Sequence, residues 1–136
     1  QKVSPSALIV IDALASRSLA RLGTTVQMCD TGISPGAGVG NARSRIDKNT
    51  MGVPVIAIGV PTVVDGATMA LDILSKAGID IGGSIKGSQL DEERRVMVTP
   101  KEIDNVISRV AAFIALGINK ALQPDIPCED LVAIVG

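Results

Sequence analysis

The chain contains no histidine, tryptophan or tyrosine, and only one phenylalanine among its 136 residues. The absence of histidine excludes Ser–His and Cys–His nucleophilic pairs within this chain, and every zinc site that has a histidine ligand. Acid–base chemistry therefore falls to Asp, Glu or Lys. The scarcity of aromatic residues removes the platforms on which single-stranded nucleic acids stack, and a net charge of −1 gives no general attraction to phosphates. We therefore expect no direct nucleic-acid partner.

Cysteine is also scarce. Cys29 and Cys128 lie far apart and lack C-x-x-C spacing, so we expect two buried thiols and no disulfide.

No apolar run reaches the length of a membrane span, and no basic segment precedes the first apolar run, so we expect a cytoplasmic protein without a membrane partner. With 46% hydrophobic and 20% charged residues, residues 1–136 are expected to fold as a single domain. Because the chain begins with Gln1, we expect its natural start to lie upstream.

Apolar runs alternate with helix-like patterns along the chain. Strands are predicted at residues 7–11, 24–29 and 54–60, and helices at residues 12–22, 63–76 and 100–122. Strands that are continuously apolar and interleaved with helices are typical of an α/β fold with a largely parallel sheet covered on both faces. The polar segment 82–95, with its charge run at 91–95, is predicted to be a solvated loop.

Helix ends carry specific signals. Gly78 is predicted to close the second helix. Thr99 suits the N-cap of the third helix, Pro100 its first position and Glu102 the capping box. Along that helix an apolar stripe with helical spacing predicts a buried face, formed by Ile103, Val106, Ile107, Val110, Ala111, Ile114 and Ile118. Pro124 and Pro127 are predicted to end the helix.

Asp12 follows directly after the first predicted strand. In parallel α/β sheets, ligands bind and chemistry occurs at the carboxyl ends of strands, so this position places an acid where a site is expected. Asp is also a favoured N-cap, and Asp12 can instead cap the helix predicted to follow it, which the local pattern favours. Local sequence leaves both interpretations open.

Residues 30–41 form a glycine-rich loop in which Gly36, Gly38 and Gly40 alternate. Glycine lets the backbone reach conformations that bring N–H groups close to a ligand or another segment. The loop lacks G-x-G-x-x-G and a Gly-Lys-Ser/Thr ending, so a structured active-site or intersubunit loop is favoured over a nucleotide site. Its first three residues spell the Asp-Thr-Gly triplet of pepsin-like proteases, but those proteases are all-β whereas this chain is predicted to be α/β.

Four segments together resemble the spore germination protease family. They are residues 9–18 (IVIDALASRS), 30–41 (DTGISPGAGVGN), 52–65 (GVPVIAIGVPTVVD) and 98–104 (VTPKEID). The resemblance implies an atypical aspartic-type endopeptidase of the spore core that degrades small acid-soluble spore proteins during germination. It implies a three-layer α/β/α fold, related to that of hydrogenase maturation proteases. It also implies a homotetramer that is made as an inactive precursor and activated by loss of a short N-terminal segment. No cofactor is expected.

The resemblance gives Asp12 one of the family's two catalytic carboxylates, while the second lies upstream of this chain. One ionised carboxylate draws a proton from water, and its protonated partner polarises the peptide carbonyl. The chain thus resembles the C-terminal half of the protease, and alone we expect it to be inactive. Residues 77–97 are shorter than the family's corresponding region. A substrate-side loop is implied for Asp30, Thr31, Gly32, Gly36, Gly38, Gly40 and Asn41.

Two other functions stay open at this point. A nucleotide- or phosphate-binding α/β module would use the end of the glycine-rich loop, residues 36–41. A noncatalytic oligomerisation fragment would need no complete site at all.

Overall fold

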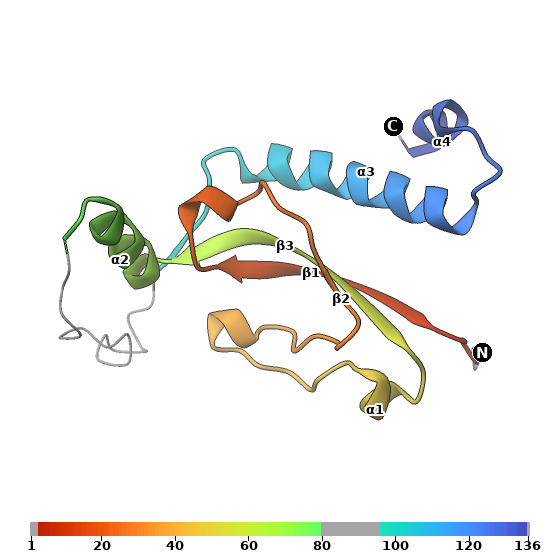
Figure 1. Cartoon of the computed structure of the whole chain (residues 1–136), viewed down its shortest axis with the longest axis horizontal. Helices are drawn as coiled ribbons and strands as arrows, with labels where there is room; N and C mark the ends of the chain where they lie inside the picture. Colours follow the sequence, from red (N-terminus) through yellow and green to blue (C-terminus); the bar gives the residue numbers. More distant parts are fainter. Residues whose placement is uncertain (1–2, 80–95, 136) are drawn as a thin grey trace. The chain divides into compact units, whose positions relative to one another are not determined.

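The computed structural model describes residues 3–79 and 96–135 (Figure 1). The chain divides into two compact units, Gln1–Pro100 and Lys101–Gly136, and each is described here by itself. The predicted solvated loop at 82–95 and its charge run at 91–95 lie almost wholly outside the described residues. The division of residues 1–136 into domains stays a prediction.

The first unit is built on one four-stranded sheet. Strand β1 (Leu8–Ser16) pairs in parallel with β3 (Val55–Asp65) along its full nine residues, and Figure 1 shows the two running side by side. On the other side of β3, the short strands β2 (Gln27–Cys29) and β4 (Met97–Val98) pair with it antiparallel. The α/β class is confirmed, and by length most of the pairing is parallel. The three-layer arrangement stays a prediction.

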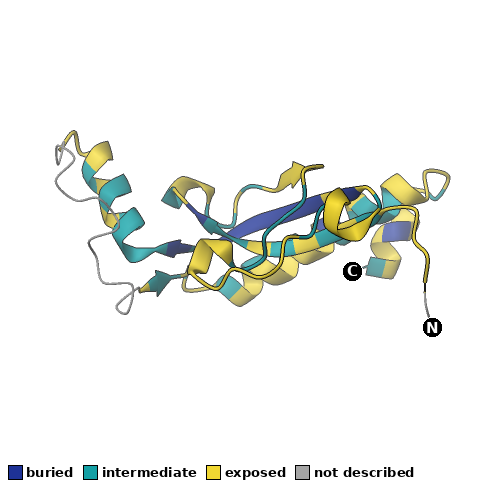
Figure 2. Cartoon of the chain, turned by 90° about the horizontal axis from the view of Figure 1, so that it is seen from below, coloured by how far each residue is buried: buried dark blue, intermediate teal, exposed yellow. Residues whose placement is uncertain are grey.

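Strand β3 forms the core of this unit. Its buried apolar side chains alternate across both faces of the strand, and Figure 2 shows it as the main buried element. A strand covered on both faces is continuously apolar in sequence, which is why residues 54–60 were recognisable as a strand. The strand continues beyond the predicted end, to Asp65. Its buried apolar residues are Val55, Ala57, Ile58, Val60, Pro61 and Val64.

The helix predicted over residues 12–22 is wrong. β1 continues through these positions to Ser16, with a register shift between Leu14 and Ala15, and only the short 3-10 helix η1 (Leu19–Arg21) follows. The helix propensities of the alanine and leucine residues here are worth only tenths of a kcal/mol each. Pairing with β3 satisfies the backbone N–H and C=O groups along the strand, and it decides the local structure.

Two α-helices of the first unit flank β3 in sequence. They are α1 (Lys48–Met51) and α2 (Gly66–Lys76). The second helix begins three residues later than predicted because β3 occupies the intervening positions. Its N-cap is Asp65, whose carboxylate accepts a hydrogen bond from the N–H of Thr68 at 3.0 Å. Gly78, with φ of +76°, closes this helix as predicted.

The second unit consists of α3 (Ile103–Leu122) and α4 (Cys128–Val135). The predicted third helix is confirmed, but its predicted start is wrong, because Glu102 occupies the N-cap without a side-chain cap hydrogen bond. Thr99 and Pro100 therefore precede the helix. The chain re-enters a helix at Cys128 after Pro124 and Pro127, and this helix, α4, was not predicted from the sequence.

The apolar stripe of α3 is less buried than predicted. Ile114 is its one buried member, at 8% exposure, whereas Ile107 is 46% exposed and Ala111 is also exposed. The remaining members are half-buried. α4 contributes the other buried core residue of this unit, Leu131, at 2% exposure. Amphipathic spacing thus identified the apolar face of the helix, but not how far this chain alone covers it.

Over residues 3–79 and 96–135, α3 is the one helix whose length and apolar composition would suffice to cross a membrane; its mean hydropathy is 1.3. The helix also carries Asp104, Arg109 and Lys120. Length and composition do not separate a membrane span from an amphipathic helix that packs against protein. The absence of a membrane partner stays a prediction.

Both cysteines are exposed free thiols, so the prediction that they are buried is wrong. Cys29 ends β2, a strand whose three residues are all exposed, and Cys128 begins α4.

Candidate active site

Asp12 lies in the middle of β1, half-buried, and pairs in register with Gly59 of β3. The prediction that Asp12 lies at the carboxyl end of a strand is therefore wrong. No helix begins at Asp12, so the capping interpretation is wrong. Its Oδ1 accepts a hydrogen bond from the N–H of its neighbour Ala13 at 2.9 Å.

Asp12 belongs to a row of three residues that crosses the sheet. Gly59 pairs with Asp12 on one side and with Gln27 of β2 on the other. Residues paired in register present their side chains to the same face of a sheet, so the Asp12 carboxyl and the Gln27 amide share one face. Gly59 between them has no side chain, and a Cβ at this position would lie 2.4 Å from Cδ1 of Leu14. Leu14 therefore lies over the backbone of Gly59.

The glycine-rich loop packs directly on β1. A short 3-10 helix, η2 (Ala37–Val39), occupies its centre, with Gly36 and Gly40 in left-handed conformations at its two ends. A Cβ on Gly38 would lie only 2.7 Å from Cβ of Ala15. Glycine at position 38 thus permits the loop to approach β1 three residues beyond Asp12.

Three backbone N–H groups at the centre of this loop are used within the loop itself. Asn41 and Val39 both donate to the carbonyl of Gly36, at 3.0 and 3.1 Å, and Ala37 donates to Ser34 at 3.2 Å. A phosphate-binding loop instead directs such groups at its ligand. The geometry therefore does not favour the phosphate-binding alternative.

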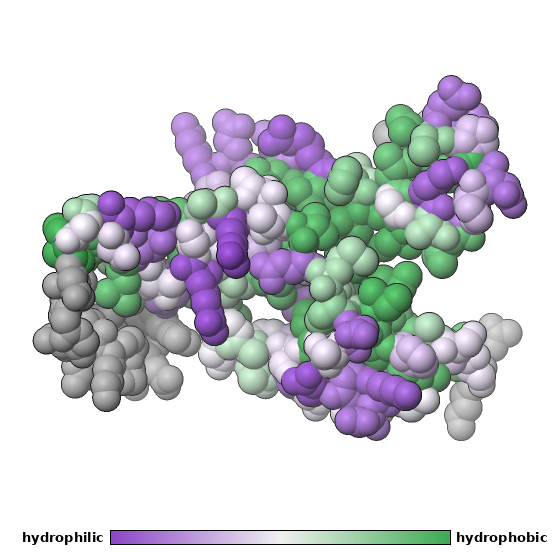
Figure 3. Space-filling model, in the orientation of Figure 1, coloured by the Kyte–Doolittle hydropathy of each residue, from purple (hydrophilic) through white to green (hydrophobic). Residues whose placement is uncertain are grey.

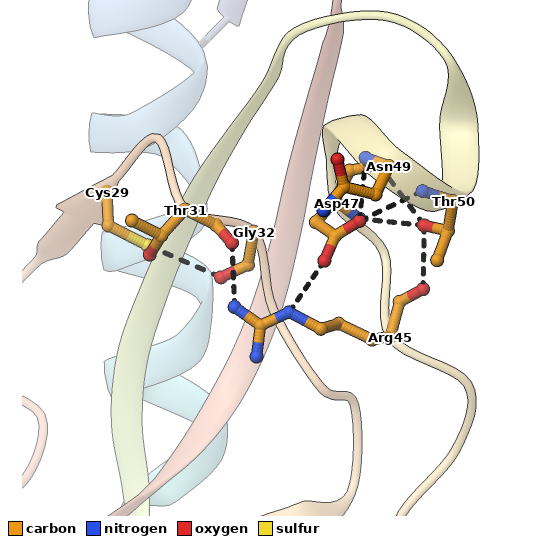
Figure 4. Close-up of polar contacts among 7 residues, drawn as sticks. All are labelled: Cys29, Thr31, Gly32, Arg45, Asp47, Asn49 and Thr50. Carbon is orange, nitrogen blue, oxygen red and sulfur yellow. Dashed lines mark hydrogen bonds and ion pairs between the residues drawn. The ribbon is translucent and has the colours of Figure 1, made fainter.

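A polar cluster fixes the base of the loop (Figure 4). Nε of Arg45 donates to Oδ2 of Asp47 at 2.8 Å, and Nη2 of Arg45 donates to the carbonyl of Thr31 at 2.8 Å. Oδ1 of Asp47 accepts from the N–H groups of Asn49 and Thr50, each at 2.9 Å. We call these five residues the Arg45–Asp47 clamp. Figure 3 shows hydrophilic surface over α1 and the segment that precedes it.

The clamp closes a hairpin-like loop. Ile33 and Ile46 form an antiparallel bridge with hydrogen bonds of 2.9 and 2.8 Å. The N–H of Thr50 contributes most to holding the pKa of Asp47 below its ordinary value of 3.8; desolvation opposes this, and Arg45 reinforces it. Neither Arg45 nor Asp47 was predicted from the sequence as a structural residue. The sequence feature that could have identified Asp47 is the D-x-x-T spacing from Asp47 to Thr50, which builds a capping box at the start of α1.

The structure does not bring Asp30 next to Asp12. Asp30 is exposed and directly follows β2, three residues past Gln27, which lies in the row of Asp12. Strand geometry puts it about 10 Å along the strand and about 10 Å across the sheet from Asp12. The other residues at this end of the loop hold it in place: the carbonyl of Thr31 accepts from Arg45, and that of Gly32 accepts from Sγ of Cys29 at 3.5 Å.

Metal-ligating side chains do not gather in the described part of the chain. Within residues 3–79 and 96–135, no three His, Cys, Asp or Glu residues form a group that could hold a metal ion.

Comparison with known proteins identifies the family. The sequence model of the germination protease family matches residues 1–93. Germination proteases from Clostridium perfringens and Caldanaerobacter subterraneus are 43% and 46% identical to this chain over 96% of its length, and one from Bacillus pumilus is 35% identical over the same share. The fold is thus an α/β sheet that carries Asp12 within its parallel strand pair, and the sequence match is to a family of proteases. The chain belongs to the germination protease family.

The chain spans about half the length of the curated relatives it matches, between 47% and 49% for these three. The alignments extend over 153 positions for the Clostridium perfringens protein and 183 for the Bacillus pumilus protein, against 136 residues here. These relatives therefore contain residues that have no counterpart in this chain. That residues 77–97 are the shortened region stays a prediction.

Proposed function

We propose that this chain is the Asp12-bearing half of an aspartic-type endopeptidase that degrades small acid-soluble spore proteins during spore germination. The observation that carries the proposal is the placement of half-buried Asp12 on the sheet face that it shares with Gln27, across Gly59, in a chain of this family. Asp12 takes a proton from a water molecule, which attacks the peptide carbonyl.

The second carboxylate comes from outside the described residues. Asp30 lies too far from Asp12 to share one water with it, because a dyad needs both groups within hydrogen-bond reach. Over the described residues, β1 pairs with β3 alone, so its other edge is open for a further strand. A segment that joins the sheet there would bring its side chains beside those of β1. The half of the relatives' length that this chain does not span is the source we propose for it.

The proposal also covers where the enzyme acts, its oligomeric state and its activation. It acts in the spore core as a homo-oligomer, a tetramer by family resemblance, and is first made as an inactive precursor. It uses no cofactor, and its partners are its protein substrates. The 136 residues alone are inactive as a peptidase.

The proposal is tested by cleavage of a purified small acid-soluble spore protein, followed by mass spectrometry. The enzyme is this chain joined to the part of the Clostridium perfringens relative that it does not match, with the 136-residue chain alone as comparison. Asp12→Asn keeps the shape of the side chain but removes the base, and we expect cleavage to fall about 10²–10⁴-fold. Asp104→Asn, at an exposed carboxylate of α3, is the matched control and should cleave normally.

Near-normal cleavage by the Asp12→Asn variant would overturn the catalytic role of Asp12. Specific cleavage by the 136-residue chain alone, lost in Asp30→Asn, would show that the dyad is complete here. Full loss of activity with a serine-directed reagent would contradict the aspartic-type mechanism.

A further inference from the structure

A cavity of about 170 Å³ opens beside the row that contains Asp12. All three strands of that row contribute to its walls: Leu14 from β1, Ala57 and Gly59 from β3, and Cys29 from β2. Ile33, at the start of the glycine-rich loop, closes another side. The sheet therefore forms the floor and the loop forms a wall.

The strand register places the cavity on the same face as Asp12. Leu14 is two residues from Asp12 in β1, and alternate residues of a strand share a face. Cys29 pairs with Ala57, two residues from Gly59, so it lies on this face as well. A chain bound beside Asp12 thus has a side-chain cavity next to it.

The lining of the cavity is mostly apolar. Gln27 is its one side-chain amide, and no charged residue lines it. An ionised or strongly polar ligand group would lose its hydration there without gaining a counter-charge. Gly59 leaves the floor free of a side chain, while the flexible end of Leu14 lies over it.

We infer that this cavity is a specificity pocket that accepts one apolar side chain, of about leucine size, from the extended peptide bound for cleavage beside Asp12. The inference rests on the proposed peptidase function. It assigns Leu14 and Ile33 to substrate selection, and it places a free thiol, that of Cys29, at the rim of the pocket as a built-in reporter.

The two exposed cysteines allow a direct test on the 136-residue chain. Alkylation by iodoacetamide is followed at Cys29 and Cys128 separately by peptide mass spectrometry. Three blocked five-residue peptides are added as probes, which differ only in a central leucine, alanine or glutamate. We expect the leucine peptide to slow alkylation of Cys29 at concentrations about tenfold or more below those needed with alanine. Cys128, in α4, is the internal control and should react at an unchanged rate.

Leu14→Gln makes the wall of the pocket polar and should abolish the difference between the leucine and alanine peptides. Leu19→Gln changes another half-buried leucine, in η1, outside the pocket, and is the matched control. Far-ultraviolet circular dichroism checks that both variants fold. Equal protection by all three peptides, no protection by any, or equal slowing of both cysteines would overturn the inference.

Two further results separate this inference from the proposed function. Cleavage that depends on Asp12, without selective protection of Cys29, would refute the pocket and leave the peptidase intact. Selective protection without cleavage by the joined two-part enzyme would refute the peptidase and leave an apolar ligand site. Protection of Cys29 in the two-part enzyme before any peptide is added would show that the protein itself fills the cavity, which also overturns the inference.

Discussion

Two carboxylates of the first unit, Asp12 and Asp47, are held in opposite ways. The side chain of Asp47 is enclosed by donors from Arg45, Asn49 and Thr50, and its carboxylate organises the loop around it (Figure 4). The side chain of Asp12, over the described residues, accepts one hydrogen bond, from the backbone of its own neighbour. Both residues are half-buried, so exposure does not distinguish them.

The difference separates a structural carboxylate from a candidate catalytic one. Both oxygens of Asp47 are occupied, so the group has little capacity left for a substrate or a water molecule. Asp12 retains unused acceptor positions on a face that also carries an amide and a cavity. The property to test is how much of its hydrogen-bonding capacity each carboxylate uses, not how far it is buried. Substitutions in the clamp region should lower stability, whereas Asp12→Asn should lower cleavage.

The largest expected effect on stability comes from Gly36→Ala. Gly36 has φ of +74°, and a Cβ there would lie 2.0 Å from the carbonyl oxygen of Asn41. We expect a loss of about 1–3 kcal/mol in the free energy of unfolding, because a left-handed conformation is strained for alanine and the loop must also shift. Urea denaturation measures the change.

Gly78→Ala is the matched control for this substitution. Gly78 has φ of +76°, but a Cβ there meets no atom of the described residues within 4 Å. It should therefore lose only the backbone term, about 1–2 kcal/mol. Equal losses for the two variants would show that the loop around Gly36 yields freely to the added methyl group.

Acid should weaken the clamp. Because the pKa of Asp47 is lowered in the folded chain, the folded state binds its proton less readily than the unfolded state does. The resulting stabilisation is present above the unfolded value near 3.8, and it is lost as pH falls through the lower folded value. We expect the melting temperature to fall in that window. Asn at position 47 can still cap α1, so Asp47→Asn isolates the charge and should flatten the fall.

A second carboxylate also contributes to the fall in melting temperature at low pH. The pKa of Asp72 is also lowered, first by the hydrogen bond from Lys76 and then by that from the N–H of Leu19. Asp47→Asn should therefore remove part of the acid dependence, and the double variant with Asp72→Asn should remove more. An unchanged curve in the double variant would mean that neither carboxylate is stabilised as an ion by the fold.

The sequence predicted those elements whose signals are local and strong. β3 was recognisable because a strand buried on both faces is continuously apolar, and α3 because its apolar residues recur with helical spacing. The course of residues 12–16 was not predictable in this way. Their composition favours a helix, and only pairing with a partner more than forty residues away makes them a strand.

The candidate site was likewise predictable only where its signals are local in the sequence. Sequence identified Asp12 as a candidate and the loop at 30–41 as structured, because both stand out by residue type. It could not place Gln27 beside Asp12, since that proximity depends on the register of two different pairings through Gly59. Nor could it show that Asp47 and not Asp30 organises the loop, because that depends on which backbone N–H groups reach each carboxylate.

The smallest expected effect belongs to Arg45→Lys, which tests whether the clamp depends on geometry or only on charge. The guanidinium donates to Asp47 and to the carbonyl of Thr31 at once, and a lysine has one terminal nitrogen for both. Its side chain is 53% exposed, so solvent screens the ion pair and the melting temperature should change far less than in Gly36→Ala.

Local opening is the sensitive measurement: the amides of Ile33 and Ile46, which form the bridge, should exchange with deuterium faster in Arg45→Lys. Unchanged exchange at both would mean that the bridge holds the loop without Arg45, and that the clamp owes its rigidity to Asp47 and the α1 cap alone.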